Sequence, residues 1–265
     1  MLTLKNVSKT FNPGTVNEKR ALNGLNLHLD AGDFVTVVGS NGAGKSTMFN
    51  AICGSFYPDS GGIFLDGQNI TFMQEHKRAS VIGRVFQDPM KGTAPNMTIE
   101  ENLALAYSKG TRGPFAFALN KKEIAFLRDR LAEFGMGLED RMKTKVGLLS
   151  GGQRQVVTLL MCTIVPPKLL LLDEHTAALD PATAQKVMEI TNMLVERHHL
   201  TTMMITHNMS AALTTGNRTI MMDDGEVLFD VSGTERDSIT LDQLLGMYSA
   251  KKNRVFDNDR MLMAE

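Results

Sequence analysis

A glycine-rich loop between a short apolar run and a helical segment constrains this chain more than any other feature. The run Phe34–Val38 is apolar and β-branched and predicts a buried strand, and a helix is predicted over Lys45–Cys53. The loop fits the pattern G-x-x-x-x-G-K-[ST] at every position, and its residues are Gly39, Ser40, Asn41, Gly42, Ala43, Gly44, Lys45 and Ser46. A strand, this loop and a helix in that order indicate an α/β fold that binds phosphate groups.

The residue types of this loop suit a nucleotide. Its glycines let backbone amides surround phosphate oxygens, and the helix N-terminus adds a partial positive charge. We expect Lys45 to reach the β- and γ-phosphates, the Ser46 hydroxyl to bind Mg²⁺, and Thr47 to hydrogen-bond the α-phosphate. A glycine-rich turn with a chance lysine is the alternative, and the flanking strand and helix disfavour it.

Composition excludes several classes of protein. The 265 residues include 28 basic and 29 acidic ones, for a net charge of −1, which argues against a chain built mainly to bind nucleic acid or an acidic membrane surface. Cys53 and Cys162 are too few for a disulfide framework and indicate free thiols in a reducing cytoplasm. The most apolar stretch, Val156–Leu172, is interrupted by Pro166 and Pro167, so we expect no transmembrane segment. Residues 1–30 form no uninterrupted apolar core behind a basic start, so we expect no signal peptide.

The order of strand and helix patterns predicts one body with a helical insertion. We expect residues 1–235 to form an α/β body, with a mainly helical segment inserted at about residues 88–150. Residues 236–265 are expected to be a partly helical C-terminal extension with a mobile end. Strands are predicted at 2–7, 22–29, 34–38, 63–65, 81–87, 169–172, 202–205, 220–222 and 227–229, and helices at 45–53, 99–107, 121–134, 156–165 and 182–198.

Two carboxylates follow the apolar run Leu169–Leu172 directly. The carboxyl end of a parallel strand lies at the ligand-binding edge of a sheet, and successive side chains there point in opposite directions. Asp173 is suited to the shell of a Mg²⁺ ion, directly or through water, and Glu174 to polarising an attacking water. A polar strand end that meets solvent is the alternative, and the phosphate loop upstream disfavours it.

A second possible anion site lies in the middle of the chain, where Ser150, Gly151, Gly152 and Gln153 precede a predicted helix. Ser150 is a favourable N-cap residue, and two glycines let an anion approach the positive end of the helix. Taken alone, this segment is explained more simply as a capped helix. One nucleotide does not require two phosphate-binding helix ends from the same chain.

Together these motifs resemble the ATP-binding subunits of bacterial ABC transporters, over essentially all of residues 2–233. In that family the segment Leu149–Gln153 is the signature motif, which contacts the γ-phosphate held by the opposite subunit, so that two chains enclose two ATP molecules. The resemblance implies a P-loop NTPase fold of the α/β class. It comprises a RecA-like mixed or parallel β core, an antiparallel β subdomain and an inserted helical subdomain.

Further residues match positions of this family one at a time. Gln87 matches the Q-loop glutamine, which senses Mg²⁺ and the attacking water, and His207 matches the switch histidine that contacts the γ-phosphate. Asp180 matches the D-loop that crosses the dimer interface. Phe11 stands where an aromatic residue stacks on adenine, although it equally suits packing at a strand end. His175 stands where many members have proline, and we assign it no catalytic role.

The resemblance implies an ATPase that dimerises on ATP, with itself or a homologous cassette, and drives transport through separate membrane subunits. Lys45, Gln87, Glu174 and His207 would be its catalytic residues. The expected cargo is a small solute, imported with a solute-binding protein and possibly an amino acid or a related compound, and the chain would act at the cytoplasmic face of the membrane. Residues 90–98 are expected to contact a membrane subunit. The alternatives are an exporter subunit, a soluble ATPase acting on ribosomes or nucleic acid, and a P-loop small-molecule kinase.

Overall fold

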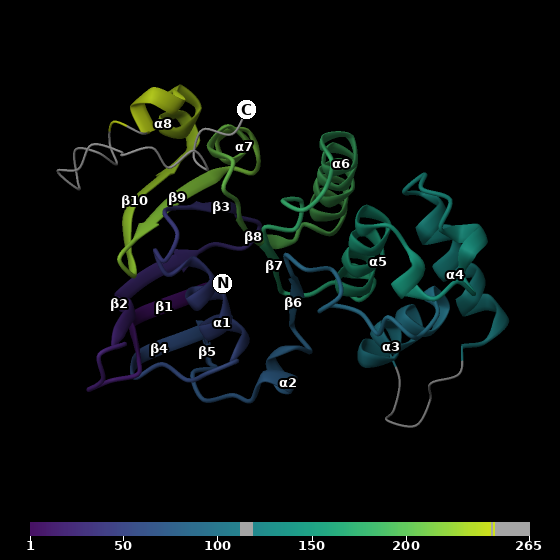
Figure 1. Cartoon of the computed structure of the whole chain (residues 1–265), viewed down its shortest axis with the longest axis horizontal. Helices are drawn as coiled ribbons and strands as arrows, with labels where there is room; N and C mark the ends of the chain where they lie inside the picture. The colour runs from purple at the N-terminus through teal and green to yellow at the C-terminus, as the bar shows by residue number, and fades with distance from the viewer. Residues whose placement is uncertain (112–118, 245, 247–265) are drawn as a thin grey trace. The chain divides into compact units, whose positions relative to one another are not determined.

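The computed structural model describes residues 1–111, 119–244 and 246 (Figure 1). The chain divides into two compact units. The first unit comprises residues 1–79 and 201–265, and the second comprises residues 80–200. The predicted mobile C-terminal end lies outside the described residues, and the predicted domain boundaries stay predictions.

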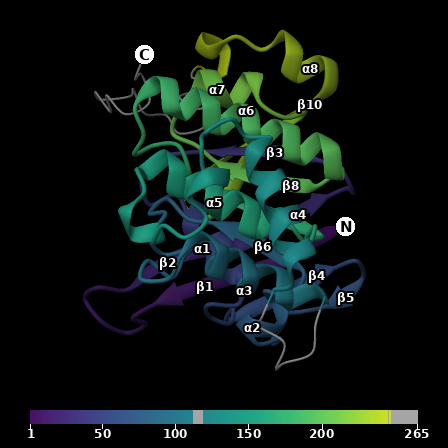
Figure 2. The same cartoon turned by 90° about the vertical axis from the view of Figure 1, so that its right-hand side faces the viewer.

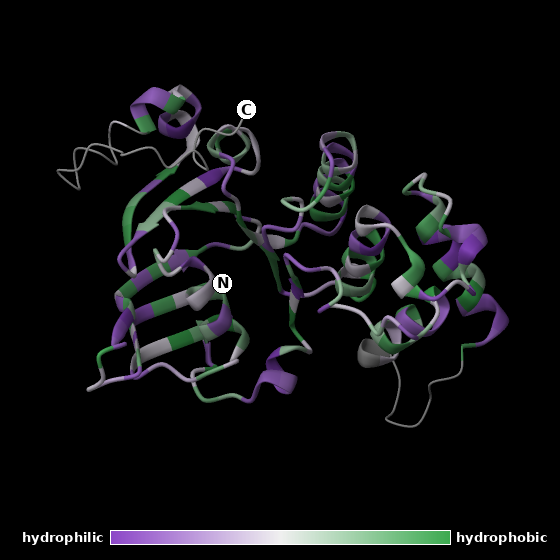
Figure 3. Ribbon diagram, in the orientation of Figure 1, coloured by the Kyte–Doolittle hydropathy of each residue, from purple (hydrophilic) through white to green (hydrophobic). Residues whose placement is uncertain are grey.

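Four antiparallel strands form one sheet of the first unit, in the order β2 (Lys19–Leu29), β1 (Leu2–Phe11), β4 (Ser60–Leu65) and β5 (Gln68–Asn69). Along β2, the buried residues Leu25, Leu27 and Leu29 alternate with exposed polar residues, and the hydropathy colouring follows this alternation (Figure 3). Alternation with a period of two is what a strand with one covered face requires, so the predicted strands are confirmed, with longer ends.

The other strands of the first unit place the phosphate loop. β3 (Phe34–Val38) pairs in parallel with both β8 (Thr201–Ile205) and β9 (Arg218–Asp223), and β9 pairs with β10 (Glu226–Ser232) in antiparallel fashion. All five residues of β3 are buried, as expected for a strand in the interior of a parallel sheet.

Four of the described helices of the first unit differ in how clearly the sequence predicts them. α1 (Lys45–Cys53) has the predicted bounds and ends at Gly54, whose φ of +84° is favourable only for glycine. The other three are α2 (Glu75–Arg78), α7 (Met209–Thr214) and α8 (Gly233–Ser238). They were not predicted, because fewer than two turns give no clear helical period.

Part of the predicted C-terminal extension packs into the first unit. Leu244 is fully buried in a cluster with Met209, Met221 and Phe229, and Ile239 packs against the same cluster. Apolar side chains buried in this way stabilise the segment that carries them. The chain up to residue 244 is therefore held against α7 and β9.

In the second unit, two parallel strands lie beside a group of helices. β6 (Ile82–Val85) pairs in parallel with β7 (Leu169–Asp173). α5 contacts β6, α3, α4 and α6 (Figures 1 and 2). The helical elements are α3 (Ile99–Thr111), α4 (Lys121–Ala132), α5 (Gly151–Thr163), α6 (Pro181–His198) and the short 3₁₀ helices Glu139–Arg141 and Val146–Leu148.

α5 begins five residues before the start that periodicity predicts, because a capping box fixes its N-terminus. The Ser150 side chain accepts a hydrogen bond from the Gln153 amide, and the Gln153 side chain accepts one from the Ser150 amide, each at 3.3 Å. The capping box provides partners for N–H groups at the helix start, which have none within the helix.

Candidate nucleotide-binding and hydrolysis site

The phosphate loop leaves β3 at Gly39 and enters α1 at Lys45, so the predicted strand, loop and helix are confirmed. Gly39 has a φ of +147°, and a Cβ atom there would lie 2.2 Å from the carbonyl oxygen of Met222. Gly44 has a φ of +100°, and its Cβ would lie 2.6 Å from the carbonyl oxygen of Ala21. Only glycine fits both positions.

Lys45 lies across this loop and is only 6% exposed. Its Nζ donates hydrogen bonds to the carbonyl oxygens of Gly39 at 2.6 Å and Ser40 at 3.1 Å. The Ser40 hydroxyl is in turn 3.0 Å from the Asp223 carboxylate at the end of β9. These bonds hold the loop in a closed curve with a buried positive charge.

The remaining loop residues surround the N-terminus of α1. Asn41 and Gly42 are exposed at the tip of the loop and Ala43 is buried. Ser46 is exposed and Thr47 is half-buried in the first helical turn, which carries no acidic residue. α1 has no side-chain N-cap hydrogen bond, so its backbone amides and helix dipole make this end a favourable place for an anion.

His207 lies at the same sheet edge as the phosphate loop. In the parallel pair β3–β8, Val37 faces Ile205, and the Thr206 amide donates to the Val37 carbonyl oxygen at 3.2 Å. Gly39 and His207 each lie two residues beyond those paired residues. The structure therefore brings His207 and the phosphate loop to adjacent strand ends.

Phe11, at the end of β1, packs against its neighbours and also exposes part of its ring. Its ring makes an edge contact with Phe56, with the centroids 5.4 Å apart and the planes at 84°, and the Lys9 ammonium lies 5.8 Å from its centroid. The side chain is nevertheless 37% exposed. The ring is thus held in place and still accessible to another aromatic group.

In the second unit, parallel pairing brings Gln87 and the acidic strand end to one edge. Val85 of β6 faces Leu172 of β7, so Gln87 and Glu174 each lie two residues beyond a paired residue. Asp173 is buried, whereas Glu174 is half-buried and Gln87 is exposed. The register of the two strands therefore brings these three polar residues to the same end of the pair.

Arg84 is a partner of the acidic strand end and is not among the predicted site residues. Its Nη2 lies 2.8 Å from Oδ2 of Asp173, and its guanidinium lies 4.7 Å from the centroid of the Phe86 ring. The charge of the buried carboxylate is thereby compensated. The signal in the sequence is a lone charge within the otherwise apolar run 81–86.

Glu174 has a backbone conformation that is unfavourable for its residue type. Its φ is +49°, in the left-handed region that residues with a Cβ atom rarely occupy. Its carbonyl oxygen accepts a hydrogen bond from the Ala177 amide at 3.0 Å, which closes a turn after β7. Such strained residues persist only where their surroundings hold them.

His175, the departure from the family pattern, is a buried neutral histidine. It is 2% exposed, and its Nε2 lies 3.1 Å from the Thr191 hydroxyl. That hydroxyl donates its proton to the carbonyl oxygen of Val187 at 2.8 Å, so Nε2 of His175 is the donor. Burial lowers the pKa of His175 to about 4.

We expect this histidine to make folding stability depend on pH. The unfolded chain binds a proton near the ordinary histidine pKa, whereas folded His175 does so only near pH 4, so stability is lost as the pH falls from about 6.5 towards 4. Between about pH 7.5 and about pH 5 the loss from this group is about 2 kcal/mol. Urea unfolding of the wild type and of His175→Gln at both pH values measures this loss of stability. His76→Gln, at an exposed histidine, is the control. Equal pH dependence in all three proteins would contradict the assignment.

The segment Ser150–Gln153 presents its first turn to solvent. Ser150 and Gly151 are exposed and Gly152 is buried, and a Cβ atom on Gly152 would lie 2.0 Å from Cγ2 of Thr183 on α6. Asp180 caps α6, with its Oδ1 accepting the Thr183 amide at 3.0 Å. Hydrogen bonds to Thr183 lower the pKa of the Asp180 carboxyl. Two helix N-termini of the second unit are thus capped and exposed.

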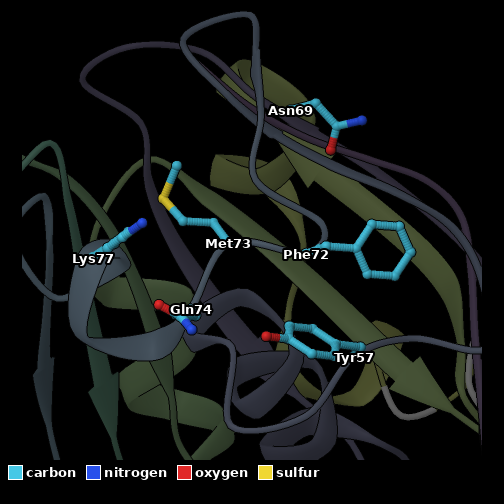
Figure 4. A pocket seen from close by; sticks show the side chains of 6 residues that line it. All are labelled: Tyr57, Asn69, Phe72, Met73, Gln74 and Lys77. Atoms are coloured by element: carbon cyan, nitrogen blue, oxygen red, sulfur yellow. The ribbon is translucent and has the colours of Figure 1, made fainter.

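Outside these loops, the first unit has a pocket of about 560 Å³ with an exposed aromatic side (Figure 4). The rings of Tyr57 and Phe72 lie 5.7 Å apart, and Phe72 is 72% exposed. Figure 4 shows these two rings close together, with Met73 and Lys77 on the other side of the pocket. The residues that line it are Tyr57, Asn69, Phe72, Met73, Gln74 and Lys77.

The chain is similar in sequence to known ATP-binding proteins of transport systems. Residues 22–177 match a family model described as "ABC transporter". The chain is 44% identical over 246 residues to a tyrosine transport ATP-binding protein of Clostridioides difficile, covering 92% of this chain and 97% of that protein. It is 35% identical over 228 residues to a choline transport ATP-binding protein of Bacillus subtilis, covering 86% of this chain and 56% of that protein.

Solved structures agree with the fold. A dimeric ATP-binding cassette in a post-hydrolysis state, bound to ADP and Pi, superposes with a TM-score of 0.74 at 32% sequence identity, covering 88% of this chain and 98% of that one. The predicted α/β P-loop fold is therefore confirmed. Within the described ranges, the structure has no helix whose length and apolar character would let it cross a membrane.

Proposed function

We propose that this chain energises the import of a small solute through separate membrane subunits. The chain belongs to the ABC transporter family and is an ATP-binding and ATP-hydrolysing subunit. One observation carries the proposal: the chain combines the phosphate loop at the start of α1 with the capped, exposed helix start at Ser150–Gln153. Two anion-binding helix ends in one chain suit two nucleotides shared between two chains.

In the first unit, we assign Lys45 to the β- and γ-phosphates, because its charge and the loop amides form a ready anion site. Thr47 binds the α-phosphate, and Phe11 stacks on adenine with its exposed part. His207 contacts the γ-phosphate from the strand end beside the loop. All four assignments rest on the family resemblance together with the positions described above.

In the second unit, we assign Glu174 to orienting and deprotonating the attacking water, with Gln87 beside it at the neighbouring strand end. Oxygen atoms of Ser46, Gln87 and Asp173 are the type of ligand that Mg²⁺ prefers, and these residues would hold the ion that accompanies ATP. Bound Mg²⁺ would supply positive charge to the phosphate groups.

A second copy, or a homologous cassette, completes each site. We propose that Ser150, Gly151, Gly152 and Gln153 contact the γ-phosphate bound by the partner's loop, and that Asp180 lies at the dimer interface. The exposure of Gly151 and of the capped Asp180 supports this assignment. ATP then joins the two chains, and its hydrolysis releases them.

The membrane partner is proposed to dock on the exposed aromatic pocket of the first unit and on residues 90–98. Phe72 and Tyr57 offer apolar surface, and Lys77 offers a positive charge. Isolated exposed aromatics are common, but an aromatic pair lining a pocket is typical of a binding surface. We propose that the chain acts at the cytoplasmic face of the membrane. A solute-binding protein outside the membrane completes the import system.

The cargo is proposed to be an amino acid or a related small molecule. The relative from C. difficile is named for tyrosine transport, and the one from B. subtilis for choline transport. Both names fit small polar solutes with a charged nitrogen. The membrane and solute-binding subunits determine which solute is transported, so this chain only couples ATP hydrolysis to transport.

Co-expression with the membrane proteins encoded by neighbouring genes tests this function. We expect the tagged chain to co-purify with a membrane protein, and Phe72→Asp to weaken that association at least about tenfold, because it buries a charge in an apolar contact, while the ATPase rate of the free chain stays unchanged. Val16→Asp, at an exposed apolar residue outside the pocket, is the matched control. Co-purification with ribosomes or DNA, and with no membrane protein, would refute the transport function.

A further inference from the structure

A buried glutamine joins the two strand ends of the second unit. Gln155 lies on α5, two residues after Gln153, and is 1% exposed. Its Nε2 donates hydrogen bonds to the carbonyl oxygen of Phe86 at 3.1 Å and to that of His175 at 2.8 Å. Phe86 directly precedes Gln87, and His175 directly follows Glu174. One amide therefore holds the backbone beside both residues.

The orientation of this amide is determined by its partners. Both acceptors are carbonyl oxygens, so the Gln155 nitrogen must face them. Its Oε1 is buried and has no hydrogen-bond partner among the residues that the structure describes. An apolar side chain of similar size would fill the same space without leaving a buried oxygen unsatisfied. The side chain therefore does more than fill a space in the core.

His175 is held from two directions. Its carbonyl oxygen accepts from Gln155, and its ring donates to Thr191 of α6. Glu174, with its φ of +49°, lies between the paired end of β7 and this clamped residue. A non-glycine residue leaves the left-handed region unless its neighbours restrain it, and the two hydrogen bonds to His175 supply such a restraint.

We propose that Gln155 is a positioning residue for hydrolysis, which fixes the main chain of Glu174 relative to Gln87 and links both to the helix that begins at Ser150. The inference rests on the proposed role of Glu174. Both hydrogen bonds that Gln155 donates lie within the second unit, on the backbone beside Gln87 and Glu174. Its loss should therefore slow the chemical step and leave ATP binding unchanged.

Gln155→Met tests the proposal, because it keeps the length of the side chain and removes both donors. We expect kcat for ATP hydrolysis to fall by at least about tenfold, since small misplacements of catalytic groups have large effects on rate, with KM for MgATP unchanged within about twofold. Amide hydrogen exchange should become faster over residues 174–177 and stay unchanged in the phosphate loop. Gln155→Asn, which is one methylene shorter, should give an intermediate kcat and serves if Gln155→Met does not fold.

Thr158→Val is the matched control. Thr158 is also buried on α5, and in the described part of the chain its hydroxyl donates to the carbonyl oxygen of Arg154 in the same helix. This variant should therefore retain the wild-type kcat and the wild-type exchange at residues 174–177. A Gln155→Met protein that matches Thr158→Val in kcat, or that raises KM alone, overturns the proposal. Slower hydrolysis without faster exchange at residues 174–177 also overturns it. Absence of ATPase activity in the wild type would instead overturn the proposed function.

Discussion

The Glu174→Gln variant is expected to bind ATP as the wild type does and to hydrolyse it roughly 10²–10⁴ times more slowly, the usual contribution of a general base. The amide keeps the size of the side chain and the strained turn after β7, but it no longer accepts a proton from water. Asp173 and its ion pair with Arg84 are unaffected by the change. Phosphate release measured at saturating ATP gives the rate, and equilibrium binding of labelled ATP gives the affinity.

Glu196→Gln, at an exposed position of α6, is the control and should leave both quantities unchanged. Hydrolysis by Glu174→Gln at the wild-type rate would remove Glu174 from the mechanism. A large loss of ATP affinity in this variant would show that the carboxylate contributes to binding and not to the chemical step.

The second large effect is expected for Lys45→Ala. Its free energy of ATP binding should weaken by about 2–5 kcal/mol, which raises Kd roughly 30-fold or more, because a buried charge that pairs with phosphate is removed. The loop itself should also loosen, since Nζ of Lys45 bonds to the carbonyl oxygens of Gly39 and Ser40. Isothermal titration with ATP, and with ADP for comparison, measures the change.

Lys122→Ala removes an equal charge from an exposed position of α4 and should leave the affinity unchanged. If Lys45→Ala retains the wild-type Kd, the loop does not hold the phosphates in the manner proposed. The thermal unfolding temperature of both variants, measured in parallel, separates a folding defect from a binding defect.

Local patterns predicted most of the fold. β3 and α1 have the predicted bounds because a fully apolar run and a glycine stop are strong local signals. α5 begins earlier than its apolar period suggests, since the capping box at Ser150 decides its start. The short helix α7 packs on the distant strand β3, which no local pattern reveals, and α8 spans fewer than two turns beside β9 and β10.

The site was predictable where a motif or a strand end defines it, and not where burial does. The parallel pair β6–β7 brings Gln87 and Glu174 to one edge, and the sequence indicated both residues by their place after a predicted strand. The roles of Arg84 and Gln155 depend on partners that are distant along the chain. Asp173 lies 89 residues after Arg84, and Phe86 lies 69 residues before Gln155. The near-complete burial of His175 likewise follows from packing on α6 and not from its neighbours in sequence.

The central claim is that ATP joins two of these chains through their helix starts at Ser150–Gln153. Light scattering on Glu174→Gln tests it most directly, with ATP, with ADP and without nucleotide. We predict that the molar mass doubles from 29.1 kDa with ATP only, and that adding Gly151→Asp prevents this, because an acidic residue suits the first turn of α5 but repels a phosphate. A protein that stays monomeric with ATP, or dimerises equally with ADP or after Gly151→Asp, would contradict the account.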